Sequence, residues 1–104
     1  MHILPFGTAL SDALVQAIRK MAEHCRRDHL DFVPHVGRST SDRGEHWELM
    51  AGPRSYMGTE NIFTLGDVSI HITALDQTKC AGKVLDWKDG VGVFEGGTPI
   101  ITNR

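Results

Sequence analysis

One amphipathic segment, residues 11–30 (SDALVQAIRKMAEHCRRDHL), restricts the fold of this chain more than any other. Wound at about 100° per residue, it gathers its apolar side chains on one stripe and leaves its charges on the flanks and back. The stripe consists of Leu14, Val15, Ile18, Met21, Ala22 and Cys25. Ser11 is a suitable N-cap, and Pro34 ends the helix by keeping Val33 out of the α region. No other segment has this periodicity, so we predict a single helix packed on strands.

The clearest strand signal lies in the second half of the chain, where two apolar runs flank Gly66 and Asp67. A two-residue turn there predicts a hairpin of strands 62–65 and 68–75. In that register Leu65 pairs with Val68 and Phe63 with Ile70. His71 then projects from the polar face of its strand.

The remaining strands are predicted from alternation and from turn residues. Residues 45–51 alternate between apolar and polar side chains, and residues 32–36 read as an edge strand because they contain Pro34. A final hairpin joins 80–87 to 91–95 through a three-residue turn with Gly90 in the left-handed region. The polar or glycine-rich segments, 37–44 and 52–60, are predicted to be exposed loops.

Together these elements predict a single domain over residues 1–104 of the α+β class. We expect one N-terminal helix packed on a four- to six-stranded antiparallel meander, in two layers. The order of elements is similar to that of cystatin-like and nuclear transport factor 2-like folds, and of small helix-plus-sheet ribonucleases. This resemblance covers element order alone, so it implies no site residue.

Composition excludes several classes of function. The net charge is −2, and basic residues alternate with acidic ones, which argues against a nucleic-acid-binding face. No apolar run approaches the ~20 residues of a membrane span, and no signal peptide is evident. Two cysteines are too few for a disulfide framework. We therefore expect a cytoplasmic protein without membrane or nucleic-acid partners.

Cys25 and His29 lie one helical turn apart, a spacing that suits shared metal ligation or a Cys–His catalytic pair. A tight metal site needs three or four protein ligands, and no further Cys or His motif supplies them. We favour a structural interpretation, in which Cys25 is a core thiol and His29 a buried, neutral histidine. No cofactor is expected.

A second candidate site lies on the polar face of the sheet. His46 and Glu48 share one strand face, and Arg54 follows in the next loop. If the two strands are neighbours, His71 joins them. Histidine, carboxylate and arginine are the groups that cleave a phosphodiester by acid–base catalysis. A small ribonuclease-type hydrolase is the alternative function.

The preferred function follows from the predicted area of the sheet. Six strands span about 29 Å, whereas a helix is about 10–12 Å across, so one helix leaves apolar sheet uncovered. A second subunit or a small apolar ligand would cover the remainder, with Trp47, Phe63 and Trp87 as the contact residues. We therefore predict a non-enzymatic binding or interaction module that forms a homodimer.

Overall fold

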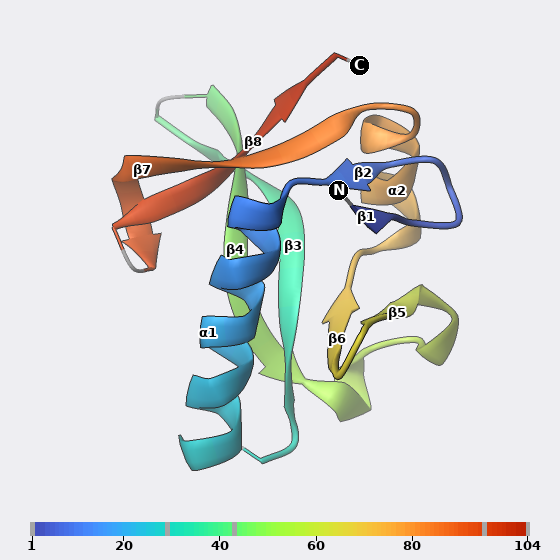
Figure 1. The fold of residues 1–104 in the computed structure, drawn as a ribbon, viewed down its shortest axis with the longest axis vertical. Helices are drawn as coiled ribbons and strands as arrows, with labels where there is room; N and C mark the ends of the chain where they lie inside the picture. Colours follow the sequence, from blue (N-terminus) through green and yellow to red (C-terminus); the bar gives the residue numbers. More distant parts are fainter. Residues whose placement is uncertain (1, 29, 43, 95, 104) are drawn as a thin grey trace.

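Over its described residues the chain folds as two mixed four-stranded sheets with two helices (Figure 1). The computed structural model describes residues 2–28, 30–42, 44–94 and 96–103. The elements in order are β1 (His2–Ile3), β2 (Ala9–Leu10), α1 (Asp12–Asp28), β3 (Phe32–Ser41), β4 (Gly44–Pro53), the 3₁₀ turns η1 (Arg54–Tyr56) and η2 (Thr59–Asn61), β5 (Ile62–Leu65), β6 (Val68–His71), α2 (Ala74–Cys80), β7 (Val84–Phe94) and β8 (Gly97–Thr102). Within the described ranges, no helix has the length and apolar character needed to cross a bilayer.

The strand orders are β1-β2-β7-β8 in one sheet and β4-β3-β6-β5 in the other. Each sheet contains one parallel pair, β2 with β7 and β3 with β6. The predicted α+β class is therefore confirmed. The predicted antiparallel meander is wrong in part, because two parallel pairings and a second sheet replace the simple up-and-down order.

Helix α1 is the predicted amphipathic helix. The Ser11 hydroxyl accepts a hydrogen bond from the Leu14 amide at 3.1 Å, as expected of an N-cap. Every predicted stripe residue is buried, and Ala17 joins them. The helix ends at Asp28, and His29 lies outside the described residues.

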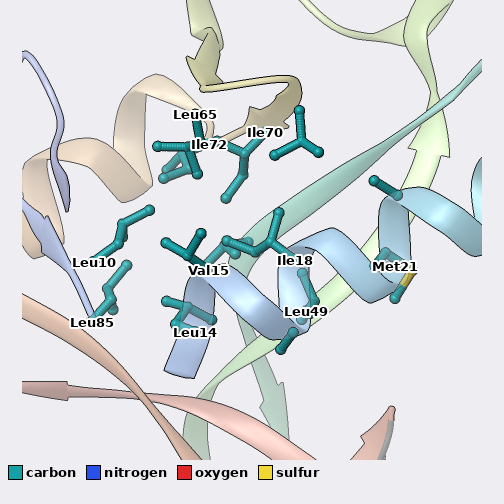
Figure 2. Close-up of a cluster of buried hydrophobic side chains, with 14 of the residues drawn as sticks. Leu10, Leu14, Val15, Ile18, Met21, Leu49, Leu65, Ile70, Ile72 and Leu85 are labelled. Atoms are coloured by element: carbon teal, nitrogen blue, oxygen red, sulfur yellow. The ribbon is translucent and has the colours of Figure 1, made fainter. Parts of the chain in front are cut away.

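The core lies between α1 and both sheets. α1 contacts β3, β4 and β6 of one sheet and β7 of the other. Val15 and Ile18 of α1 point toward Ile70 and Ile72, whereas Leu85 of β7 lies at the other side of the same cluster (Figure 2). The expectation of one wide sheet under a single helix is therefore wrong, because the strands form two smaller sheets and α1 packs against both.

The long hairpin of β3 and β4 corrects the predicted loop over 37–44. β3 continues to Ser41, and β4 begins at Gly44, with Arg38 paired opposite Trp47. Arg38 is stabilised in the strand by ion pairs to Asp76 at 3.3 Å and Glu45 at 3.1 Å. Polar composition alone does not reveal these partners, which lie elsewhere in the chain.

The predicted edge position of the first strand is also wrong, because β3 lies between β4 and β6. The contact with β6 consists of one register position, His35 opposite His71. Pro34 has no amide hydrogen to donate to a neighbouring strand, but β3 and β6 pair at His35 alone, so little of their pairing is lost.

The β5–β6 hairpin has the predicted register, with Leu65 opposite Val68 and Phe63 opposite Ile70. The second strand ends at His71, however, and α2 begins at Ala74, within the segment predicted to be strand. The Thr73 hydroxyl accepts a hydrogen bond from the Asp76 amide at 3.3 Å and so caps this helix. A Thr followed three residues later by an acidic residue is a helix-start signal that the strand prediction overlooked.

The predicted final hairpin is wrong. β7 runs continuously from Val84 to Phe94 and pairs with β8, with Trp87 opposite Pro99. Gly90 does adopt a positive φ of 83°, but within an irregular stretch of β7. Residues 97–102, which lie outside every predicted strand, supply the partner strand β8.

Candidate functional site: a histidine pair under a small cavity

Two histidines meet on the face of the β4-β3-β6-β5 sheet that is turned away from α1. His35 of β3 lies directly opposite His71 of β6, and their Nδ1 atoms are 2.8 Å apart. Their ring centroids are 5.0 Å apart. One Nδ1 must donate and the other accept, so when both rings are neutral they are opposite tautomers. His71 is 7% exposed, and His35 is half-buried.

The surroundings of the His35–His71 pair favour neutral rings. Burial lowers the pKa of His35, and positive charge on His71 lowers it further. Burial likewise lowers the pKa of His71. The carboxylates of Asp76 and Glu60 oppose these effects, Asp76 at His35 and Glu60 at His71, but they do not outweigh burial.

Asp76 is held in place beside the pair by Arg38. One Asp76 oxygen accepts from the Arg38 amide at 3.2 Å, and the other accepts from Arg38 Nε at 3.3 Å. Gly37 lies beneath these groups. A Cβ atom at position 37 would lie 2.5 Å from His35 Nε2 and 3.1 Å from Asp76 Oδ2, so the close packing here requires glycine.

A cavity of about 210 Å³ opens over the pair, and we call it the histidine pocket. Its walls are the two imidazoles, two thioethers, a phenol ring and small residues. The lining residues are His35, Met50, Ala51, Gly52, Pro53, Tyr56, Met57 and His71. None of them is a carboxylate, a thiol or an aliphatic hydroxyl. The pocket therefore combines apolar walls with two imidazoles and a phenol, which are groups that bind a ligand.

The four predicted hydrolase residues do not form one site: His46 and Glu48 lie together, whereas Arg54 and His71 lie elsewhere. His46 Nε2 and Glu48 Oε1 are 2.7 Å apart on β4, as their shared face requires. His46 is paired with Ser39 of β3, whereas His71 is paired with His35 of β3. Ser39 and His35 are four residues apart, which is roughly 13 Å along the strand. Arg54 lies in η1 and lines another cavity, beside Cys25. His71 pairs with His35 instead.

The three aromatic residues predicted to contact a ligand lie in three different surroundings. Trp47 is buried and lines a cavity of about 340 Å³ together with Arg38, His46, Lys79 and others. Phe63 packs edge-on against Phe6, with ring centroids 5.2 Å apart. Trp87 Nε1 donates to Asp89 at 3.0 Å.

Cys25 occupies the core position predicted for it, 5% exposed on α1. Burial raises the pKa of its thiol. Its predicted neighbour His29 lies outside the described residues, so the structure does not describe a Cys25–His29 pair. Over the part of the chain that the structure describes, no group of three or more His, Cys, Asp or Glu side chains could hold a metal ion.

Comparison with known proteins gives similarity of fold alone. No protein-family model matches the chain, and no curated protein matches it by sequence. The structure of IscA with a [2Fe-2S] cluster is similar, at 16% identity and a TM-score of 0.54, covering 92% of this chain and 84% of that one. An NMR structure of a protein from Aquifex aeolicus is 18% identical, with a TM-score of 0.58, and covers 100% of this chain and 98% of that one.

Proposed function

We propose that this domain is a non-enzymatic binding module whose ligand occupies the histidine pocket. The observation that carries the proposal is the contact of two hydrogen-bonded imidazoles with an otherwise apolar cavity. Small-molecule sites typically combine apolar walls with a few convergent polar groups. Perturbed histidines in a cavity are a further mark of functional sites. Among the described lining residues there is no carboxylate, thiol or aliphatic hydroxyl, which favours binding over group transfer.

The cysteines of this chain do not suit an iron–sulfur cluster. Such clusters are held mainly by cysteine thiolates, usually four. The chain has two cysteines, Cys25 on α1 and Cys80 at the end of α2, and both are buried. Burial raises the pKa of both thiols, and Cys80 Sγ lies 3.3 Å from the Thr8 hydroxyl oxygen. These residues do not fit the cluster that the IscA structure contains.

The cytoplasm is the setting that we propose, because two free cysteines suit a reducing compartment. Self-association stays a prediction, although two smaller sheets replace the single wide sheet that suggested it. Sedimentation at micromolar concentration checks it, and a homodimer gives twice the chain mass. The absence of tight nucleic-acid binding also stays a prediction, checked by titration with RNA at low salt.

The location of the ligand site is tested by titrating isotopically labelled protein with a library of uncharged fragments and following the amide resonances. We expect shifts centred on β3, β4 and η1. Met57→Ala removes one wall of the pocket and should weaken the fragments found there. Leu75→Ala is the matched control, because Leu75 is an exposed apolar side chain on α2 that does not line the pocket. Shifts centred instead on the cavities beside Cys25 or Lys79 would overturn the proposal.

A further inference from the structure

Three potential metal ligands form a row across three adjacent strands. Met50 of β4 is directly opposite His35 of β3, which is directly opposite His71 of β6. Directly opposed residues in a sheet share a face, with Cβ atoms about 4.5–5.5 Å apart. Met57 reaches the same pocket from the loop after η1. Two imidazole nitrogens and two thioether sulfurs therefore line one cavity.

The imidazole nitrogens already converge. Their Nδ1 atoms are 2.8 Å apart and share one hydrogen atom. A metal ion bound to both at about 2.0 Å would place them about 3.3 Å apart at a tetrahedral angle, or about 4 Å apart when linear. The rings must then part by roughly 0.5–1.2 Å. His35 is half-buried and has one side toward the pocket, so its ring has room to shift.

The type of ligand selects the metal. Thioethers favour Cu(I), whereas carboxylates and water favour harder ions. No carboxylate lines the pocket, and the nearby Asp76 is engaged by Arg38. Neutral imidazole and thioether ligands leave the single charge of Cu(I) uncompensated within the pocket. Asp76 at His35 and Glu60 at His71 act from outside the pocket, and both favour positive charge at the two rings.

We propose that the ligand of the histidine pocket is Cu(I), held by Nδ1 of His35 and of His71, with Met50 or Met57 as a thioether ligand. This inference rests on the proposed function, since it identifies the ligand class of that same pocket. Binding exchanges one hydrogen bond for two metal–nitrogen bonds. The donor ring moves its proton from Nδ1 to Nε2, so no net proton is released and no electron is transferred.

The test is an anaerobic titration of the full chain with Cu(I), kept reduced and in competition with a chromogenic Cu(I) chelator. We expect one ion per chain. His35→Ala should weaken binding by at least about tenfold, and Met50→Leu should weaken it measurably. His46→Ala is the matched control, because His46 lies on the same sheet face outside the pocket, and it should leave the affinity unchanged. Circular dichroism of each variant checks that it folds.

If a histidine variant unfolds, two further measurements still identify the ligands of the bound Cu(I). X-ray absorption of the copper complex of the natural chain should show nitrogen ligands with one or two sulfur ligands. Cys25→Ala and Cys80→Ala should each retain full Cu(I) affinity, which excludes the thiols as the source of that sulfur. The proposal is overturned by no stoichiometric binding, by loss of binding in a cysteine variant, or by equal affinity in His35→Ala and the natural chain. Fragments that still bind the pocket after such a result would leave the proposed function standing.

Discussion

His35 and His71 lie 36 positions apart in the sequence, yet their Nδ1 atoms share a hydrogen bond of 2.8 Å across the parallel pairing of β3 and β6. The pairing is a single register position, so the two rings sit where the hairpin of β3 and β4 meets the hairpin of β5 and β6. The histidine pair thus joins two units of one sheet. It also forms the polar part of the histidine pocket.

The pair predicts how stability depends on pH in the metal-free protein. Both histidines have a folded pKa below the unfolded value of about 6.5. The unfolded chain therefore binds more protons than the folded chain between those pKa values. Stability should be full above pH 6.5, decline as the pH falls toward the folded pKa values, and level off below them.

Urea denaturation at a series of pH values measures this dependence. His35→Gln removes one of the two titrating groups and should reduce the loss of stability in acid. Met50→Leu changes the pocket but keeps both imidazoles, so it should leave the pH dependence as it is. A free energy of unfolding that is constant from pH 7.5 to 5 would contradict the buried, neutral pair.

Gly37 is the position where a single methyl group disturbs the site most directly. Its Cβ would lie 2.5 Å from His35 Nε2, so Gly37→Ala must displace the ring or the strand. We expect a loss of about 1–3 kcal/mol in the free energy of unfolding. Gly52→Ala is the control, because its Cβ meets only Met57 Cε at an ordinary 3.5 Å. Equal losses in the two variants would show that His35 does not cover Gly37.

Thr73 tests the start of α2, which positions Asp76 beside the pair. Its hydroxyl is the N-cap, so Thr73→Ala should cost about 1 kcal/mol in thermal or urea unfolding. Thr78→Ala changes an exposed threonine within the same helix and should stay within about 0.5 kcal/mol of the natural chain. No difference between the two variants would mean that this cap does not stabilise α2.

The buried Thr8 links the N-terminal segment to the end of α2. Its hydroxyl donates to the Cys80 carbonyl at 2.6 Å, and the side chain is fully buried. Thr8→Val keeps the shape but leaves that carbonyl without this donor, which should cost about 1–3 kcal/mol. Thr64→Val, at an exposed position of β5, serves as the control and should change stability little. An unchanged melting temperature in Thr8→Val would show that the hydrogen bond contributes nothing net.

Local signals in the sequence were sufficient for α1 and for the β5–β6 hairpin. The apolar stripe of α1 and the Gly66 turn each lie within one short segment, so their geometry follows from neighbouring residues. The β3 strand was predicted only in part, because Arg38 is stabilised by Asp76 from another element. The second sheet depends on the parallel pairing of β2 with β7, and no local pattern specifies a pairing across about 75 positions.

The candidate site was missed for the same reason. Prediction placed His71 on an exposed polar face and grouped it with His46 and Glu48, whereas it is buried against His35. His35 lies in the segment 32–36, which was predicted to be an edge strand because it contains Pro34. His35 is a polar residue within the apolar segment 32–36, which was a local sign that this histidine has a partner. The partner comes from the parallel strand, which depends on tertiary contacts alone.

The central claim, that His35 and His71 form one hydrogen-bonded pair, is tested most directly by the imidazole ¹⁵N resonances of the metal-free protein near pH 7.5. The structure predicts opposite tautomers, with one ring protonated at Nδ1 and the other at Nε2. His35→Gln should then alter the nitrogen shifts of His71 and leave those of His2 as they are. Two independent rings of the same tautomer, with His71 unaffected by His35→Gln, would contradict the account.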